Sequence, residues 1–120
     1  MRIGDLAAET GVSKRLLRYY EEQGLLRPER LSNGYREYAR SHVAAVRHIR
    51  VLLDAGMPTS AISRVLHCVH DEADGVVPSA CPEMLENLRR ERRRIIAAIT
   101  QLQANQDAID SLLTTALRDS

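Results

Sequence analysis

Residues 13–38, SKRLLRYYEEQGLLRPERLSNGYREY, combine a basic amphipathic segment with a glycine stop and a hairpin signal. Ser13 is a favourable helix N-cap, and Gly24 supplies the left-handed residue that ends many helices. In the helix that this predicts between Ser13 and Gly24, the spacing of Leu16, Leu17 and Tyr20 predicts that they form one apolar face. The opposite face is basic and hydrogen-bonding, and it carries Lys14, Arg15, Arg18 and Tyr19. The stretch therefore begins with a predicted cationic amphipathic helix.

A tight turn is predicted after this helix. Asn33-Gly34 is a strong hairpin signal, here between the short strands Arg30-Leu31 and Tyr35-Arg36. Two strands alone are marginally stable in water, so the hairpin must pack against the helices beside it. Held in this way, it forms a wing whose basic side chains can lie along a phosphate backbone. A helix followed by a wing predicts a nucleic-acid-binding unit.

Residues 3–10, IGDLAAET, predict a short first helix that ends at Gly11. The turn Gly11-Val12-Ser13 then completes a helix-turn-helix, a motif whose second helix enters the major groove of DNA. The side chains expected nearest to DNA are Lys14, Arg15, Arg18 and Tyr19. Basic residues on a helix are also typical of a solvated face, and the hairpin that follows is what favours DNA.

The charge of the chain is unevenly distributed. Residues 1–50 hold ten Lys and Arg against six Asp and Glu, a net charge of +4, whereas residues 51–120 hold seven against ten, a net charge of −3. Phosphate attraction is thus expected of the first half. No apolar run approaches a membrane span and no signal peptide is recognisable, which predicts a cytoplasmic protein without a membrane partner. No paired carboxylates or Gly-rich phosphate loop indicate an enzyme.

Two further helices are predicted after the hairpin. Ser41 is a second favourable N-cap, and apolar residues continue at helical spacing as far as a stop at Gly56. Pro58-Thr59 then opens a shorter helix with Ile62, Val65 and Leu66 on its inner side. Residues 67–81, HCVHDEADGVVPSAC, are acidic and lack a sustained period, so they predict a linker or effector loop.

One long helix is predicted from Pro82 to about Leu117, because more than thirty residues follow Pro82 without Gly or Pro. Its apolar side chains recur in alternating three- and four-residue steps over five heptads and fill eight of ten seam positions. The ten positions are Leu85, Leu88, Arg92, Ile95, Ile99, Leu102, Gln106, Ile109, Leu113 and Ala116. Such a seam predicts a coiled-coil homodimer.

Three interpretations of the cysteines remain open from the sequence. Cys68 and Cys81 can pack as small hydrophobic side chains. They can form a thiol switch, because Cys81 lies at a helix start, where unsatisfied amides favour the thiolate. A metal ion can instead bind Cys68, His70 and Cys81, together with His67, as a mixed nitrogen and sulfur ligand set. Two cysteines in a reducing compartment favour free thiols, metal ligands or a redox pair over a structural disulfide. The sequence requires no cofactor.

The N-terminal part of the chain closely resembles the winged helix-turn-helix of the MerR family of bacterial transcriptional regulators. The resembling stretch is IGDLAAETGVSKRLLRYYEEQGLLRPERLSNGYREY, and its segments LRYYEEQGLL and NGYREY carry most of the match. The resemblance implies a mainly α-helical fold with a winged helix-turn-helix domain including the helix pair (1–67), a linker or effector loop (68–81), and a dimerisation helix and tail (82–120) forming an antiparallel coiled coil. It also implies a homodimer on a pseudo-palindromic promoter operator. Such dimers bend and untwist the DNA so that RNA polymerase can engage both promoter elements.

Residue by residue, the resemblance places Arg18, Tyr19, Tyr35 and Arg36 at DNA-contacting positions. Lys14 and Arg15 match variable positions that tune operator choice. Metal-sensing members have one cysteine at the start of the dimerisation helix, which Cys81 matches, and two more after that helix, whereas no cysteine follows residue 81 in this sequence. The signal therefore stays open among a thiol-reactive compound, a metal ion and a small molecule. The alternative function is a coiled-coil adaptor that binds protein without specific DNA binding.

Overall fold

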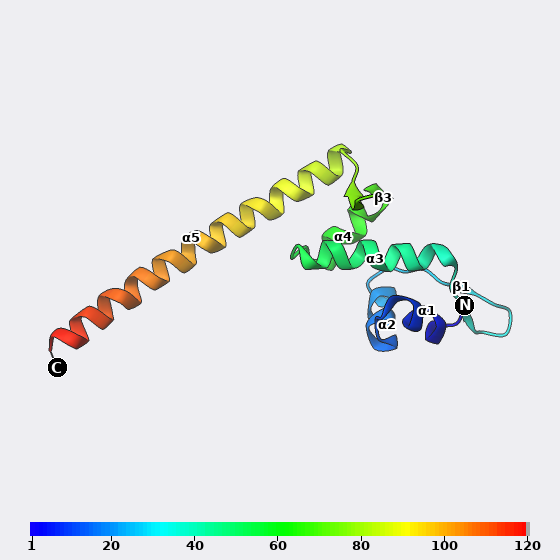
Figure 1. Cartoon of the computed structure of the whole chain (residues 1–120), viewed down its shortest axis with the longest axis horizontal. Helices are drawn as coiled ribbons and strands as arrows, with labels where there is room; N and C mark the ends of the chain where they lie inside the picture. The colour runs from blue at the N-terminus through cyan, green and yellow to red at the C-terminus, as the bar shows by residue number, and fades with distance from the viewer. Residues whose placement is uncertain (120) are drawn as a thin grey trace. The chain divides into compact units, whose positions relative to one another are not determined.

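The computed structural model describes residues 1–119 and is mainly α-helical, as the sequence predicts (Figure 1). Two compact units divide the chain, one from Met1 to Asn87 and one beginning at Leu88. The first unit contains four α-helices, two hairpins and the first six residues of the fifth helix. The beginning of α5 therefore belongs to the same compact unit as the helix-turn-helix and the two hairpins.

The helix-turn-helix consists of α1 (Ile3–Thr10) and α2 (Lys14–Glu22). Gly11 lies between them with a φ of 71°, the left-handed conformation that a side chain would disfavour. Ser13 caps α2 as predicted, because its hydroxyl oxygen accepts a hydrogen bond from the backbone N–H of Leu16 at 3.1 Å. The turn and both helices thus follow from local sequence signals.

One face of α2 packs into the core of the first unit. Leu17 and Tyr20 are buried there, together with Leu6 of α1. Leu16 was predicted on the same face, and this prediction is wrong, because its side chain is 39% exposed. Successive residues point about 100° apart on a helix, so Leu16 and Leu17 cannot both face the centre of a small core.

The predicted wing is confirmed as a two-stranded antiparallel hairpin of β1 (Glu29–Arg30) and β2 (Arg36–Glu37). Each strand lies one residue further from the turn than predicted. Leu31 and Tyr35 close the loop instead, through a hydrogen bond from the Leu31 N–H to the Tyr35 carbonyl at 2.8 Å. Gly34 completes the turn with a φ of 86°.

Helix α3 (Arg40–Asp54) begins before the predicted cap at Ser41, which lies inside the helix. The earlier start is explained by the side chain of His42, a residue type that sequence patterns do not treat as a helix cap. His42 Nδ1 accepts the backbone N–H of Ala39 at 2.8 Å, so the opposite nitrogen carries the proton and can donate to the Arg27 carbonyl at 3.2 Å. Ala39 is therefore the N-cap of α3, and the imidazole joins that cap to the segment before the wing.

Helix α4 (Thr59–Val65) starts after Pro58, as predicted. Ile62 and Val65 are buried, and Leu66 is half-buried in the short 3-10 turn η1 (Leu66–Cys68) that follows. The core of the first unit thus lies among α1, α2, α3 and α4. Its largest fully buried side chains include Tyr20 and Tyr38, the two tyrosines expected in the core.

A second hairpin occupies residues 69–78, where the sequence predicted an irregular linker or effector loop. Strand β3 (Val69–Glu72) pairs antiparallel with β4 (Gly75–Pro78), and Gly75 has a φ of 125°. The two strands were not predicted, because each has only four residues, too few to establish a period, and acidic side chains mask the strand signal. The Asp74-Gly75 dipeptide was the overlooked turn signal.

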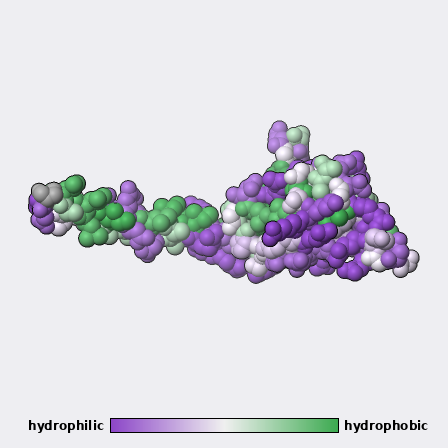
Figure 2. All heavy atoms as spheres, turned by 90° about the horizontal axis from the view of Figure 1, so that it is seen from below, coloured by the Kyte–Doolittle hydropathy of each residue, from purple (hydrophilic) through white to green (hydrophobic). Residues whose placement is uncertain are grey.

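Helix α5 (Pro82–Arg118) has 37 residues, which at 1.5 Å per residue corresponds to about 55 Å. Its first turn belongs to the first compact unit, where Met84 is fully buried. From Ile95 onward its large apolar side chains are exposed, and Figure 2 shows them gathered along the helix. They are Ile95, Ile96, Ile99, Leu102, Ile109, Leu112, Leu113 and Leu117. Ser120, the last residue of the predicted tail, lies outside the described residues.

Every helix within residues 1–119 falls short of the combined length and apolarity that crossing a bilayer requires.

Candidate nucleic-acid interface

The outward face of α2 carries the predicted recognition residues. Lys14, Arg15, Arg18 and Tyr19 are all exposed, while Leu17 and Tyr20 hold the opposite face in the core. Tyr19 is 42% exposed and leans on Tyr20, with ring centroids 6.5 Å apart and planes tilted by 52°. The helix is thus fixed by its apolar side and presents three cations and a phenol to solvent.

The wing presents Tyr35 beside the start of α1. Tyr35 is 59% exposed, and its backbone N–H donates to the Asn33 side-chain oxygen at 3.1 Å, which stabilises the turn. The guanidinium of Arg2 lies over the Tyr35 ring, 4.3 Å from its centroid. A cation over an aromatic face at this distance is attractive, so the wing tip is joined to the N-terminal end of α1.

Arg36 connects the wing to the recognition helix. Its Nε lies 2.9 Å from Glu21 Oε1 in an ion pair, although the N–H is not directed along a hydrogen bond. The Tyr38 hydroxyl donates to the other oxygen of Glu21 at 3.4 Å. Burial and the neighbouring Glu21 raise the pKa of Tyr38 above its ordinary value, so this hydroxyl keeps its proton. Glu21 thereby fixes Arg36 and Tyr38 relative to α2.

A hollow of about 180 Å³ lies between α2 and the wing, and its wall includes the side chains of Arg2, Arg18, Tyr35 and Arg36. Three of these were predicted from sequence as DNA contacts. Arg2 was missed, because a lone arginine before a helix has no distinguishing pattern. The structure does not bring Lys14, Arg15 or Tyr19 into this hollow, and they lie along the exposed face of α2 instead.

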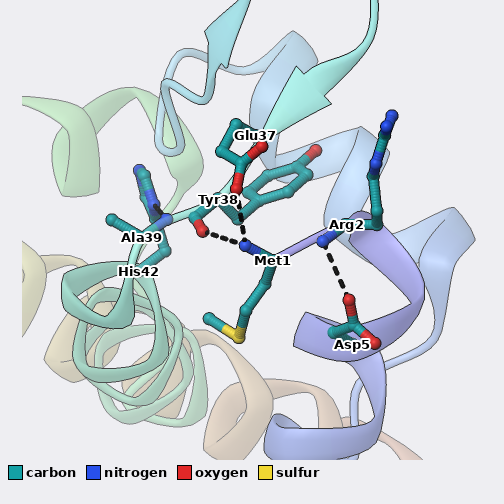
Figure 3. A network of polar contacts seen from close by, with 7 residues as sticks. All are labelled: Met1, Arg2, Asp5, Glu37, Tyr38, Ala39 and His42. Atoms are coloured by element: carbon teal, nitrogen blue, oxygen red, sulfur yellow. Dashed lines mark hydrogen bonds and ion pairs between the residues drawn. The ribbon is translucent and has the colours of Figure 1, made fainter.

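The N-terminal segment is tied to the second wing strand (Figure 3). The Met1 ammonium donates to Glu37 Oε1 at 3.1 Å and to the Tyr38 carbonyl at 2.8 Å, and the Tyr38 N–H donates to the Met1 carbonyl at 2.7 Å. The Arg2 N–H donates to Asp5 Oδ2 at 3.0 Å, which closes the start of α1. These contacts place Arg2 next to the wing.

The two cysteines lie together outside this interface. The structure joins Cys68 and Cys81 in a disulfide with Cα atoms 6.7 Å apart, which agrees with the redox pair among the interpretations of the sequence and differs from free thiols and from metal ligands. The second hairpin brings the two cysteines together, because its strands are antiparallel and Cys68 precedes the first strand while Cys81 follows the second. Neither cysteine is free in this structure.

The predicted metal set is not assembled around these sulfur atoms. His70 instead hydrogen-bonds through one ring nitrogen to Glu72 at 3.1 Å and through the other to Ser79 at 3.1 Å. His67 is the histidine at the cysteines, with Nε2 3.3 Å from Cys68 Sγ. Within residues 1–119, no group of three or more His, Cys, Asp and Glu side chains has a metal-binding arrangement.

The second hairpin contacts α3 through Asp71. Its carboxylate accepts from Arg47 at 2.7 Å and bonds His48 Nε2 at 3.0 Å. The hydrogen bond from Arg47, followed by that from His48, lowers the pKa of Asp71 below its ordinary value. Sequence reasoning missed this contact because the hairpin that creates it was not predicted.

A family model described as "MerR HTH family regulatory protein" matches residues 1–67, which is more than half of the chain. The chain belongs to the MerR family. The family match covers the helix-turn-helix, the wing and the α3–α4 helix pair, so the resemblance found in the sequence is confirmed.

Curated MerR-type relatives include proteins named for responses to metals. The mercuric resistance operon regulatory protein of Bacillus cereus is 40% identical over 74 residues, 60% of this chain and 56% of that protein. The HTH-type transcriptional regulator HmrR of Rhizobium leguminosarum bv. viciae is 35% identical over 72 residues, with the same two coverages. Heavy metal-dependent transcription regulator 2 of Rhizobium meliloti is 32% identical over 105 residues, 85% of this chain and 69% of that protein. The chain thus spans little more than half the length of the first two.

Solved structures of MerR regulators share the fold. A regulator from Bacillus cereus superposes with a TM-score of 0.62 at 20% identity, covering 92% of this chain and 78% of that chain. HiNmlR, described as a MerR family regulator lacking the sensor domain and bound to promoter DNA, superposes with a TM-score of 0.55 at 21% identity, covering 94% and 86%. At these identities the likeness shows the winged helix-turn-helix and long-helix fold.

Proposed function

We propose that this MerR-family protein is a homodimeric transcriptional regulator that binds a pseudo-palindromic promoter operator in the cytoplasm and activates by distorting the spacer DNA. The observation that carries this proposal is the convergence of Arg2, Arg18, Tyr35 and Arg36 on one hollow between the recognition helix and the wing. Three guanidinium groups around a concave surface suit a phosphate backbone, which contributes much of the affinity of DNA-binding proteins.

The recognition helix supports the base-reading part of the proposal. Lys14 and Arg15 lie in its exposed first turn, the part of a recognition helix that contacts base edges in the major groove. Arginine can bind a guanine through two parallel hydrogen bonds, and lysine can bind the same acceptors. We therefore assign operator choice to Lys14 and Arg15, and positioning on the phosphates to Arg18, Tyr19, Tyr35 and Arg36.

Dimerisation is supported by the second compact unit. Five of its predicted seam residues are large, apolar and 40–65% exposed, namely Ile95, Ile99, Leu102, Ile109 and Leu113. A long helix with such a stripe buries it most simply against a second copy, because two identical seams match in period. Two copies would present two recognition helices, one to each half of a palindromic operator.

Activation requires that the dimer supply the energy of DNA distortion. Smooth bending of a short site costs about 1–6 kcal/mol, and two recognition helices with two wings offer enough contacts to offset such a cost. RNA polymerase is the proposed second partner, since a distorted spacer changes how it meets the two promoter elements. Among the open signals, the paired cysteines favour a thiol-reactive one.

The proposal is tested by selecting bound fragments from a genomic DNA library with purified protein, followed by transcription of the selected promoter with RNA polymerase. We expect a palindromic operator, binding that weakens steeply with salt, and more transcript when the protein is added. Arg18→Ala should reduce binding, whereas Arg93→Ala, the same loss of charge on the exposed side of α5, should not. If no specific operator is enriched, the protein-binding adaptor becomes the better description.

A further inference from the structure

Cys68 and Cys81 lie close together within the first compact unit, where the structure joins them in a disulfide. Cys68 ends η1, directly before β3, and Cys81 directly precedes α5. Their Cα atoms are 6.7 Å apart, within the range that a disulfide spans without moving the backbone. The twelve residues between them contain the second hairpin, so the cross-link closes the base of that hairpin.

The backbone holds the two positions together independently of the sulfur–sulfur bond. Val69 pairs with Pro78 in the hairpin, and the Ser79 N–H donates to the Cys68 carbonyl at 2.6 Å. This ladder ends next to both cysteines. The reduced thiols would therefore stay close to one another, so the bond can form and break without unfolding the hairpin.

The two sulfur atoms have different surroundings. Cys68 is buried, with 4% of its surface exposed, and lies 3.3 Å from His67 Nε2. Cys81 is more exposed, and its sulfur accepts a hydrogen bond from the Met84 N–H at 3.4 Å at the start of α5. Donors at a helix start stabilise a thiolate, so Cys81 is the sulfur suited to meet an oxidant from solvent. Cys68 is suited to react with it afterwards.

We propose that Cys68 and Cys81 form a reversible dithiol–disulfide site that reacts with hydroperoxides and sets the promoter output of the regulator. This inference rests on the proposed function. In the first step the Cys81 thiolate attacks a peroxide oxygen and the O–O bond breaks. Cys81 becomes a sulfenic acid, and the departing alkoxide takes a proton to leave as an alcohol, or as water from hydrogen peroxide.

In the second step His67 accepts the proton of the Cys68 thiol, whose sulfur attacks Cys81. The S–O bond breaks, and the departing hydroxide takes the proton from His67 to form water. Two thiols are thus oxidised to one disulfide, and the hydroperoxide is reduced to an alcohol and water. Glu83, with Oε2 3.9 Å from His67 Nε2, stabilises the imidazolium that forms between the two transfers. A thiol reductant returns the pair to two thiols by thiol–disulfide exchange and is itself oxidised to a disulfide.

The site is linked to the DNA-binding helices through the hairpin that it closes. Asp71 of β3 holds Arg47 and His48 of α3, so the hairpin is attached to α3 by its side chains and to α5 by the disulfide. Reduction removes the covalent link between Cys68 and Cys81, so that the start of α5 is held to the hairpin by the backbone ladder alone. We assign spacer distortion to the oxidised form, in which the disulfide also holds the start of α5, and operator binding to both forms.

The test uses the full chain, reduced, freed of reductant and treated with hydrogen peroxide. Peptide mapping should find Cys68 linked to Cys81 within one chain, and promoter output should rise several-fold while operator affinity stays within about twofold. Cys81→Ser should abolish the cross-link and the rise. Cys68→Ala should leave a sulfenic acid on Cys81 that a dimedone probe captures. His67→Ala should slow ring closure by roughly tenfold or more, as expected for loss of a proton acceptor, whereas His70→Ala should not.

The outcomes separate this inference from the proposed function. A Cys68→Ala/Cys81→Ser double variant that binds the operator but ignores peroxide supports both. Intact operator binding without an intramolecular disulfide, or with peroxide-driven output that persists in the double variant, overturns the inference alone. Failure of the reduced wild-type chain to bind any operator overturns the proposed function, while the disulfide can still be scored by mapping. Circular dichroism establishes that each variant is folded.

Discussion

The guanidinium of Arg2 lies 4.3 Å from the centre of the Tyr35 ring, which joins the start of α1 to the tip of the wing. A cation over an exposed ring contributes about 0.5–1 kcal/mol, and here it holds two proposed DNA contacts in place. We expect Arg2→Ala to weaken operator binding by about two- to fivefold per protomer. Arg2→Lys should lose less, because a cation remains. Fluorescence anisotropy on labelled operator measures both.

A double-mutant cycle separates positioning from direct DNA contact. If Arg2 acts partly by holding Tyr35, then Arg2→Ala and Tyr35→Leu together should cost less than the sum of the single changes. Strict additivity would mean that the stacked pair has no role in binding.

Arg18 is expected to contribute a phosphate contact from the wall of the hollow between α2 and the wing. On double-stranded DNA each neutralised phosphate adds about 0.9 to the slope of log affinity against log salt concentration. Arg18→Ala should therefore reduce the slope by about 2 for a dimer, along with the affinity. Operator-binding titrations at several salt concentrations measure the slope. Arg93→Ala, which removes the same charge from α5, is the control and should leave the slope unchanged. An unchanged slope would assign Arg18 a structural role.

The seam of α5 is expected to determine the oligomeric state. Leu102 is 65% exposed in the single chain, so Leu102→Lys should leave the first unit folded but place a charge in the dimer seam. We expect sedimentation equilibrium to show monomers at concentrations where the wild type is dimeric. Ala104→Lys adds the same charge on the opposite side of the helix and should leave the dimer intact. Dissociation by both variants would argue for repulsion by charge alone.

Asp71 is expected to hold the second hairpin on α3 in a pH-dependent manner. Its pKa is lowered from the ordinary value of 3.8, so its stabilising contribution is fully present above that pH and is lost as the pH falls through the lowered value. Asp71→Asn should increase hydrogen exchange in residues 69–78 at neutral pH. Glu72→Gln changes the same charge on the same strand without removing a contact to α3. Equal exchange in both variants would contradict the role of Asp71.

Leu16 and Leu17 provide a matched pair for the core of the helix-turn-helix. Leu17 is fully buried, so Leu17→Ala should lower the free energy of unfolding by about 2–5 kcal/mol. Leu16→Ala removes the same atoms from a partly exposed side chain and should cost at most about 1 kcal/mol. Urea denaturation followed by circular dichroism compares them. Similar costs would place Leu16 in the core after all.

Local signals predicted most of the elements because each depends on a few neighbouring residues. Ser13 caps α2 through its own hydroxyl, and Gly11 and Gly34 adopt backbone conformations that only a residue without a side chain adopts readily. The length of α5 follows from the absence of Gly and Pro over more than thirty residues after Pro82. These features could be read from sequence because their partners lie within a few positions along the chain.

Residues 13–38 form the predicted helix and wing, although Leu16 is partly exposed and each wing strand is shifted by one residue. The sequence by itself determined the family, the recognition helix and the long helix. Only the tertiary structure decided that Arg2 joins the wing, that Arg36 pairs with Glu21, and that Cys68 meets Cys81 while His70 turns to Glu72 and Ser79. Each of these contacts except the last joins residues that are more than ten positions apart. Such contacts depend on how elements pack or on a hairpin too short to show a period, and no local pattern of side chains encodes that.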